Sequence, residues 1–370
     1  MSDRYLKAQV LQDLEEKMVF LAGPRQVGKT TLAKEVCGPR GLYLNWDADE
    51  DRTAILKKEF KKTDFIVFDE IHKFKRWRNY LKGIYNKKDD KLKILVTGSA
   101  RLDLYRRGGD SLQGRYHFLR MYPLSVAELG ISNENDFQGL LNLGGFPEPY
   151  FKQRKSAADR WTSQYQTRVV RDDVASLEQV QDVSLVEMLA HRLPHCVGSP
   201  LSINALREDL QVAHKSVVRW MGILERLYVQ FPVAPFGSPL IKAVKKERKH
   251  YLYDWNVLAD VGARFENLVA VHLLKWCHWR EDTLGEALEL RYFRLVDGSE
   301  VDFVVTLKGK PVLAVECKWQ DSVVHKPLKY FKGKFPQCRA VQVVGGGGKE
   351  FVTADGIEVL SAWKLLASCV

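Results

Sequence analysis

A glycine-rich stretch near the start of the chain has the residue types and spacing needed to hold phosphate groups. Residues 23–30 read GPRQVGKT and fit the pattern G-x-x-x-x-G-K-[ST] at every fixed position. The glycines let successive backbone N–H groups point toward one anion, and Lys29 offers a positive charge to the outer phosphates. The Thr30 hydroxyl can ligate Mg²⁺. The predicted nucleotide-binding residues of this stretch are Gly23, Pro24, Arg25, Gln26, Val27, Gly28, Lys29, Thr30 and Thr31.

Acidic and hydroxyl side chains end two further apolar runs of strand length. The run FIVFDE ends in Asp69 and Glu70, and the run ILVTGS ends with Thr97 and Ser99. We predict that Asp69 holds Mg²⁺ together with Thr30, and that Glu70 polarises the attacking water. Thr97 and Ser99 are candidates for sensing the terminal phosphate. The predicted chemistry is hydrolysis of ATP, with ATP and Mg²⁺ as cofactors.

These side chains need a parallel sheet to bring them together. The apolar runs at residues 18–22, 41–45, 64–69 and 93–97 are separated by helical patterns. Such alternation indicates a parallel α/β sheet, in which ligands gather at the carboxyl ends of the strands. A helix starting near residue 30 would add the N–H donors of its first turn.

An arginine that follows these strands can complete the site. In assembled ATPases, an arginine of one subunit can reach the nucleotide of its neighbour. Arg115, in the sequence SLQGR, is the favoured candidate for this catalytic role. Arg101, Arg106, Arg107 and Arg120 are the alternatives.

Basic and aromatic residues alternate between residues 72 and 93. Cationic side chains serve phosphates, whereas the rings of Trp77, Tyr80 and Tyr85 can stack on bases. An equally good interpretation is a solvated helix whose aromatic side chains pack inward. The predicted DNA contacts of this segment are Lys75, Arg76 and Arg78.

Residues 201–227 fit two short helices around a turn, followed by a hairpin, and so resemble a helix-turn-helix with a wing. The second helix would present Lys215, Ser216 and Arg219 to a DNA groove, and Trp220 is a further candidate. Winged helices also serve as protein–protein modules, and the run KAVKKERKH at residues 242–250 can contact phosphates or simply be solvated. The expected apolar stripe is Leu206, Leu210, Val217, Val218, Met221, Ile223, Leu224 and Leu227.

Three carboxylates and a lysine follow in the tail. Glu316 and Lys318 share one face of an apolar strand, because side chains alternate along it. With Asp302 on the preceding strand, they resemble the D…E-x-K site of restriction-endonuclease-like folds. That resemblance implies that Asp302, Glu316 and Glu266 hold Mg²⁺ while Lys318 orients or deprotonates a water. A nuclease fold kept for binding or assembly is the alternative.

The chain as a whole resembles the AAA-superfamily ATPases, in particular a prokaryotic branch that ends in a restriction-endonuclease-like domain of the PD-(D/E)xK, RecB type. The residues that carry the resemblance read GPRQVGKT, FIVFDEIHK, ILVTGSA and SLQGRYHFLRMYPLSVAEL. It implies an α/β fold in three parts: a P-loop parallel-sheet ATPase domain at 1–128, a helical and winged-helix middle at 129–255, and a restriction-endonuclease-like α/β domain at 256–370. Members of this branch form rings, which implies a homo-oligomer, expected as a hexamer or heptamer.

Composition favours an anionic partner. The net charge is +11, and residues 1–130 contain 26 Lys and Arg against 18 Asp and Glu. Nucleic acid is the first expectation, ahead of an anionic membrane. No apolar run approaches the roughly 20 residues that span a bilayer, the start of the chain is polar, and six cysteines are scattered. We therefore expect a cytoplasmic protein with reduced thiols and no membrane partner.

The sequence leads to one principal functional hypothesis and two alternatives. The first is an ATP-driven motor on DNA, performing strand separation, branch migration or translocation. The second is a metal-dependent DNA nuclease that its ATPase part loads or regulates. The third is a nucleotide-dependent switch that assembles signalling or defence partners.

Overall fold

The structure is a computed structural model that describes residues 4–87, 91–99, 112–174, 182–237, 248–295, 297–320 and 323–370. These residues form two compact units. Unit 1 comprises the chain up to Pro123 together with Arg226–Tyr228, and unit 2 comprises Leu124–Glu225 and Val229–Val370. Unit 2 thus includes most of the predicted middle domain and all of the predicted C-terminal domain.

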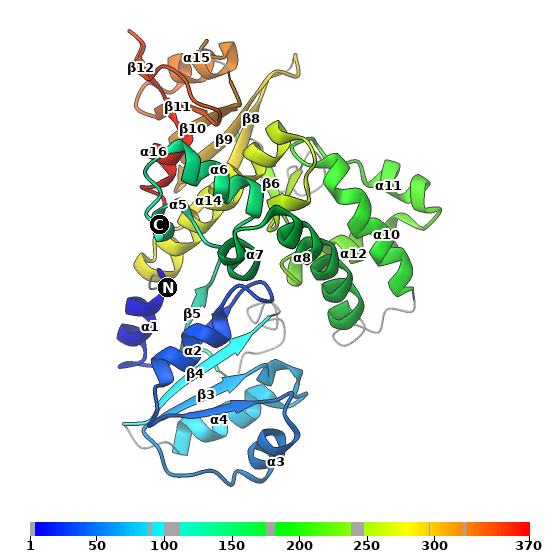
Figure 1. Ribbon diagram of the computed structural model, residues 1–370, viewed down its shortest axis with the longest axis vertical. Coiled ribbons are helices and arrows are strands. Elements are labelled where there is room, and N and C mark those ends of the chain that lie inside the picture. The colour runs from blue at the N-terminus through cyan, green and yellow to red at the C-terminus, as the bar shows by residue number, and fades with distance from the viewer. Residues whose placement is uncertain are drawn as a thin grey trace. The chain divides into compact units, whose positions relative to one another are not determined.

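Unit 1 is built on a five-stranded, all-parallel sheet in the order β2-β3-β4-β1-β5 (Figure 1). The predicted α/β fold with a parallel P-loop sheet is confirmed. The elements are α1 (Lys7–Asp13), β1 (Met18–Ala22), α2 (Lys29–Cys37), β2 (Leu42–Asn45), α3 (Asp49–Lys57), β3 (Phe65–Asp69), α4 (Trp77–Lys87), β4 (Lys93–Gly98) and β5 (Tyr116–Arg120).

Helices α2 and α4 cover opposite faces of this sheet. Lys34 of α2 lies over the ring of Tyr43, 4.7 Å from its centroid. Tyr43 belongs to the same cross-strand row as Val19, so the next residue, Phe20, points to the other face. There Phe20 meets Trp77 of α4, with ring centroids 5.7 Å apart. Covering on both faces explains why β1 is apolar and buried along its whole length.

Unit 2 contains an eight-stranded mixed sheet in the order β12-β13-β11-β10-β9-β8-β6-β7. Strands β8, β9 and β10 run antiparallel, and β10, β11 and β13 run parallel. The antiparallel hairpin β6–β7 joins this sheet through parallel pairing of β6 with β8. The strands are β6 (Gln230–Pro235), β7 (Lys249–Leu252), β8 (Leu288–Arg294), β9 (Glu300–Leu307), β10 (Lys310–Lys318), β11 (Arg339–Val344), β12 (Phe351–Val352) and β13 (Ile357–Ser361).

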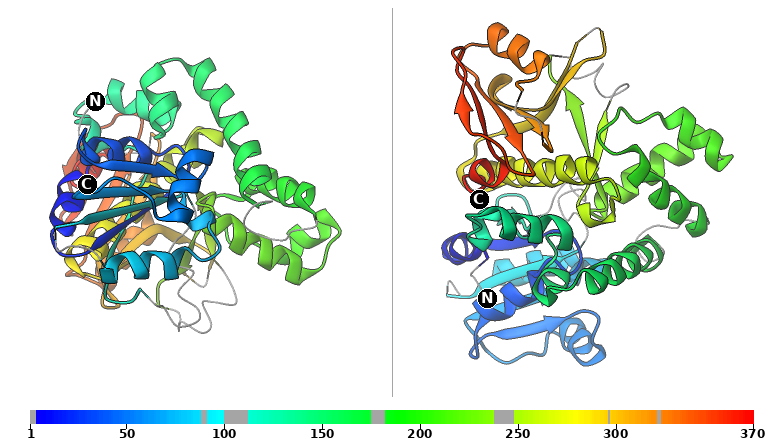
Figure 2. Two further views of the ribbon diagram at one scale, coloured as in Figure 1. Left: turned by 90° about the horizontal axis from the view of Figure 1, so that it is seen from below. Right: turned by 45° about the horizontal axis from the view of Figure 1, so that its top comes forward.

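Several helices of unit 2, from α5 to α12, precede its first strand in the chain. They are α5 (Val126–Leu129), α6 (Glu134–Leu143), α7 (Pro147–Lys152), α8 (Lys155–Arg168), α10 (Val183–Arg192), α11 (Ile203–Leu210), α12 (His214–Arg226), α14 (Val261–Leu284), α15 (Lys326–Lys334) and α16 (Ala362–Leu366). The 24-residue α14 packs on β8, β9 and β10 (Figure 2). It starts at Asp260, whose carboxylate accepts the N–H of Ala263 at 2.8 Å, and stops at Gly285 in the left-handed conformation.

Helices α11 and α12 form around a turn, as the sequence predicts. The apolar face of α12 differs from the prediction in two positions. Val218, expected in the stripe, is 49% exposed, whereas Trp220, expected near a DNA groove, is buried. Trp220 lies three residues after Val217, on the same side of the helix, and its large ring fills the inner face. The predicted wing residues 242–247 lie outside the described residues.

Candidate active site

The phosphate-binding loop is held in a conformation that its glycines make possible. Gly23 has φ of +153° and Gly28 has φ of +103°, and Gly28 immediately precedes α2. A Cβ atom on Gly23 would lie 2.2 Å from the carbonyl oxygen of Met121. Two constraints, an unusual φ and a neighbouring backbone, therefore restrict position 23 to glycine.

Lys29 is buried at the start of α2, with its ammonium turned into the loop. Its Nζ donates hydrogen bonds to the carbonyl oxygens of Gly23 at 2.8 Å and Pro24 at 2.6 Å. These carbonyls hold a cation beside the N–H groups of the loop. The charge is thereby positioned for an anion that enters the loop.

Asp69 is a buried carboxylate at the centre of a network of hydroxyl groups. The Thr30 hydroxyl donates to Oδ2 of Asp69 at 2.8 Å, and the Tyr43 hydroxyl donates to the same oxygen. The Thr97 hydroxyl donates to Oδ1. Asp69 and Thr97 face each other in the register of β3 and β4, so the sheet itself sets this contact. The structure brings together Thr30, Asp69 and Thr97 as the sequence predicted.

Glu70 follows directly, in the left-handed region with φ of +55°. Its N–H donates to the carbonyl oxygen of Thr97 at 3.0 Å. Its Oε2 lies 3.3 Å from the hydroxyl of Ser99 and 3.5 Å from Nζ of Lys73. His72 is also near, and burial lowers the pKa of its imidazole. Glu70 is thus a restrained, partly accessible carboxylate beside Asp69.

Tyr43, Lys73 and Arg4 belong to this site, although the sequence analysis did not single them out. Burial, then the hydrogen bond to Asp69, raise the pKa of Tyr43, which keeps its hydroxyl protonated as a donor. Lys73 bridges Glu70 and Asp47. Arg4 donates to the carbonyl oxygens of Val27 and, at 2.6 Å, Tyr122. The sequence feature that could have identified Tyr43 is its position near the end of β2, the strand that pairs with β3.

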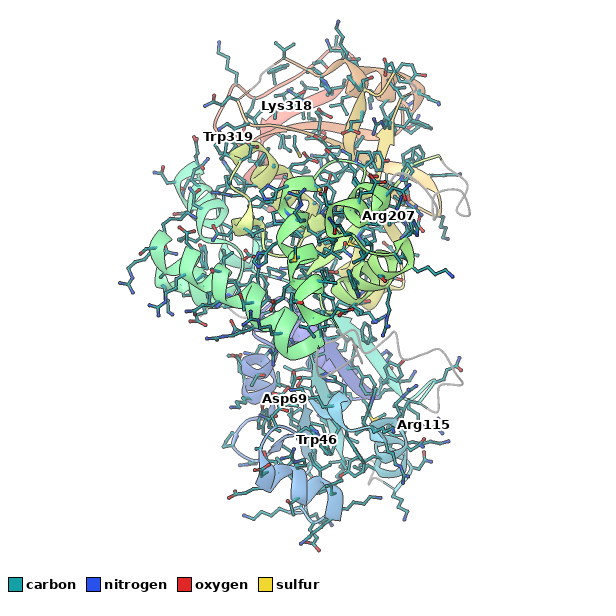
Figure 3. All side chains as sticks on the ribbon, turned by 90° about the vertical axis from the view of Figure 1, so that its right-hand side faces the viewer. Trp46, Asp69, Arg115, Arg207, Lys318 and Trp319 are labelled. Carbon is teal, nitrogen blue, oxygen red and sulfur yellow. The ribbon has the colours of Figure 1, made fainter. Side chains whose placement is uncertain are left out.

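Arg115 lies at the opposite edge of the sheet. It directly precedes β5, and its carbonyl oxygen accepts the N–H of Met18 at the start of β1. The loop follows the other end of β1, about 13 Å away at the rise of a strand. Figure 3 shows Arg115 and Asp69 apart in unit 1. Arg115 therefore does not contribute to the site of its own chain, and its role as a finger in a neighbour stays a prediction.

The basic segment before β4 separates its aromatic residues from its charged ones. Trp77 and Tyr80 are buried in unit 1, so the stacking of these rings on bases, one of the two interpretations, is wrong. Amphipathic packing of α4 against the sheet explains this. Lys75 and Arg76 are exposed and Arg78 is half-buried. On α12, Lys215 and Arg219 are also exposed. Their contacts with DNA stay predictions.

The four predicted residues of the tail come from α14, β9 and β10, and their binding of a metal ion stays a prediction. Cys317 donates its N–H to Oδ2 of Asp302 at 2.8 Å, and Tyr251 donates its hydroxyl to Oε1 of Glu266 at 2.7 Å. Lys318, labelled in Figure 3, holds its Nζ 2.9 Å from Oε1 of Glu316. Among the residues that the structure describes, no three His, Cys, Asp or Glu side chains are arranged to hold a metal ion.

Comparison with known proteins defines the class of unit 1. Residues 15–130 match the family model of an AAA domain. Together with the loop, the parallel sheet and the Thr30–Asp69 contact, this match makes the N-terminal part an AAA-type P-loop ATPase domain. Residues 134–264 and 261–365 match two domains of unknown function, DUF8612 and DUF4143. The restriction-endonuclease-like and winged-helix assignments stay predictions.

The relatives that match over most of the chain have no described function. The uncharacterized protein Rv2008c of Mycobacterium tuberculosis is 24% identical over 314 residues, which cover 80% of this chain and 68% of that protein. An uncharacterized protein of Haemophilus influenzae is 22% identical over 393 residues, covering 92% of each.

Two solved structures are similar at low TM-score. A RuvB variant of Thermotoga maritima is 19% identical with a TM-score of 0.31, and the match covers 61% of this chain and 88% of RuvB. A signal transduction ATPase of the STAND class from Pyrococcus horikoshii, with a tetratricopeptide repeat sensor, is 13% identical with a TM-score of 0.24, over 74% of this chain and 46% of that one. In the described part of the chain, the helices are too short or too polar to cross a membrane.

Proposed function

We propose that this protein hydrolyses ATP with Mg²⁺ at the loop of residues 23–31 and uses the cycle to act as a motor on DNA. The observation that carries the ATPase part is the hydrogen bond between Thr30 and Asp69. It places a loop hydroxyl and a strand carboxylate in direct contact, at the edge where Lys29 and Glu70 also lie. These are the parts that phosphoryl transfer requires.

The side chains present fit a magnesium ion. Hydroxyl and carboxylate oxygens are ligands that Mg²⁺ prefers, and Thr30 and Asp69 would hold it, directly or through water. When bound, the ion supplies positive charge that neutralises the phosphate oxygens. The hydroxyls of Tyr43 and Thr97 keep the Asp69 carboxylate oriented.

The chain's own residues supply the rest of the chemistry. Backbone N–H groups of the loop and the first turn of α2 bind the phosphates. Lys29 exchanges its carbonyl partners for phosphate oxygens, and Glu70 orients the attacking water and accepts its proton. The Ser99 hydroxyl, 3.3 Å from Oε2 of Glu70, can bind the terminal phosphate and so link the presence of that phosphate to the position of the Glu70 carboxylate.

The DNA part of the proposal is supported by charge. The chain carries a net charge of +11, and exposed cations occupy the segment before α4 and one side of α12. The position of Arg115, away from its own site, agrees with a ring in which each subunit completes the next, as a hexamer or heptamer.

The first experiment compares ATP hydrolysis by the wild type with three variants. Lys29→Ala should lose turnover by about 100-fold or more through weaker phosphate binding and charge stabilisation. Glu70→Gln should bind ATP normally while turning over about 100-fold more slowly. Thr53→Ala, which alters an exposed hydroxyl in unit 1, should match the wild type.

The outcome separates the competing functions. Turnover that survives in Lys29→Ala would show that hydrolysis occurs elsewhere. Tight ATP binding with slow hydrolysis and no affinity for DNA would instead identify a nucleotide switch. A motor should bind duplex or branched DNA with an affinity that falls steeply with salt.

A further inference from the structure

A lysine is completely buried among the carboxylates of the C-terminal site. Lys249 is the first residue of β7, and its side chain has no exposed surface. Its Nζ lies 2.5 Å from Oε1 of Glu300 and 4.0 Å from Oε1 of Glu266. It also lies 5.2 Å from the centroid of the Tyr292 ring. Three elements, β9, α14 and β8, therefore enclose one ammonium group.

The pairing of strands places this ammonium there. The hairpin β6–β7 continues the sheet beyond β8, which directs the first residue of β7 inward. Glu300 and Asp302 are two residues apart on β9, so both point to the same face. Glu266 comes from the second turn of α14, which covers that sheet.

Carboxylates approach this ammonium from two sides. Oε1 of Glu300 and Oε1 of Glu266 both lie within ion-pair distance of Nζ of Lys249. A lysine side chain thus supplies a cation to these carboxylates. The remaining carboxylate, Glu316, pairs with Lys318, whose Nζ lies 2.9 Å from Oε1, and Nδ1 of His325 lies 2.8 Å from the same oxygen.

The hydrogen bonds and ion pairs of Glu266, Asp302 and Lys249 do not fit the binding of a divalent cation. Mg²⁺ needs about six oxygens near 2.1 Å, usually including several waters. Here Oε1 of Glu266 accepts a hydrogen bond from Tyr251, and Oδ2 of Asp302 accepts one from Cys317. The ammonium of Lys249 occupies the space between Glu266 and Glu300.

We propose that the ammonium of Lys249 takes the place of a divalent cation, so that the carboxylates of Glu266, Asp302 and Glu300 form a charge-compensated centre that excludes metal. The centre holds α14 against β7 and β9, and it does not support metal-dependent DNA cleavage. This inference is independent of the proposed ATPase function, because it concerns only residues of unit 2.

Manganese binding by the intact, nucleotide-free chain tests the proposal. The key variant carries Lys249→Met with Glu300→Gln, which removes the ammonium together with its nearest carboxylate and so leaves the net charge of the centre unchanged. A control variant with Lys310→Met and Glu281→Gln, at two exposed positions, makes the same changes of charge at the surface. Mn²⁺ binding is followed by electron paramagnetic resonance, and the melting temperature is measured with and without millimolar Mn²⁺. Each protein is also prepared with Asp302→Asn.

The wild type and the surface variant should show no Mn²⁺ binding that depends on Asp302. The buried variant should gain a Mn²⁺ site roughly tenfold tighter than any Mn²⁺ binding by the wild type, with a melting temperature that Mn²⁺ raises, and lose both effects with Asp302→Asn. Asp302-dependent binding by the wild type would overturn the proposal. A folded buried variant that ignores Mn²⁺, or one that stays unfolded in millimolar Mn²⁺, would also overturn it, since metal would have failed to replace the ammonium.

Discussion

The hydroxyl of Thr30 donates a 2.8 Å hydrogen bond to Oδ2 of Asp69, joining the start of α2 to the end of β3. The two residues are 39 positions apart in the sequence. The contact arises because Tyr43, Asp69 and Thr97 line the sheet face that α2 covers. It identifies the pair of oxygens that would share a magnesium ion.

Replacing this hydroxyl should weaken the response to Mg²⁺. Thr30→Ala removes the loop ligand while leaving Asp69 with the hydroxyls of Tyr43 and Thr97. We expect the Mg²⁺ concentration for half-maximal ATP turnover to rise about 10- to 100-fold. Thr53→Ala should leave it unchanged. Equal Mg²⁺ dependence in Thr30→Ala and the wild type would exclude Thr30 as a ligand.

Adding one methyl group at position 23 should disrupt the loop. The new Cβ of Gly23→Ala would meet the carbonyl oxygen of Met121 at 2.2 Å, in a region of φ that disfavours side chains. We expect the free energy of unfolding to fall by about 1–3 kcal/mol and ATP binding to be lost. Denaturant unfolding and calorimetric titration with ATP measure the two effects.

Gly83→Ala is the matched control for this variant. Gly83 lies in α4, and a Cβ there would meet nothing within 4 Å. Alanine should therefore leave ATP binding intact and stabilise the protein by up to about 1 kcal/mol. If Gly23→Ala and Gly83→Ala have equal ATP affinity and equal free energy of unfolding, the close approach of Gly23 to Met121 does not determine the conformation of the loop.

The stability of unit 2 should depend on pH through His272. This imidazole is buried in α14, where its Nδ1 contacts the carbonyl oxygen of Leu268 at 2.8 Å and its Nε2 accepts the N–H of Val126 at 3.1 Å. Both bonds are satisfied by the neutral ring. Burial lowers the pKa of His272 to about 4; the hydrogen bond to Leu268 and the charge of Glu128 act to raise this pKa, and the charge of Lys275 acts to lower it.

The unfolded chain therefore binds a proton on this ring more readily than the folded one between about pH 6.5 and 4. The contribution of the neutral His272 ring to the free energy of unfolding is fully present above pH 6.5. It is lost as the pH falls, by an amount on the order of 3 kcal/mol. His272→Gln should flatten this part of the pH profile in denaturant unfolding, whereas the exposed His214→Gln should not. Parallel profiles for wild type and His272→Gln would contradict a neutral buried ring.

The cations just before and at the start of α4 should contribute to DNA binding. Reversing the charges of Lys75, Arg76 and Arg78 should weaken binding and reduce the slope of log K against log salt by about two to three, because up to three phosphate contacts are lost. Fluorescence anisotropy over a range of salt concentrations measures both quantities. Reversing Lys57, Lys61 and Lys62, which are also exposed, gives the same change in net charge. Equal losses in both triple variants would show that only net charge matters.

The nucleotide site could be predicted from sequence because its pattern is local. The loop fixes its glycines, lysine and threonine within eight residues, and parallel strands necessarily bring Asp69 and Thr97 to the same edge. Tyr43 escaped prediction since an aromatic residue in an apolar strand is usually part of a core. Its hydroxyl has a role only because β2 pairs with β3.

The positions that differ from prediction depend on contacts between distant segments. Val218 and Trp220 are apolar side chains of the same helix, and only packing against other segments decides which of them is buried. Lys249 lies at the end of the basic run KAVKKERKH, which suggested phosphate contact or solvation. Its burial follows from the pairing of β6 with β8, and no local pattern encodes that pairing.

ATP turnover with and without DNA tests the central proposal most directly. The wild type and Lys29→Ala are each supplied with Mg-ATP alone, with linear duplex or with a branched junction, and the same reactions are run on a gel for cleavage. Turnover by the wild type should rise when DNA is added, turnover by Lys29→Ala should be lower by about 100-fold or more in every reaction, and the DNA should stay uncut. Identical wild-type rates with every DNA and without it would contradict a motor.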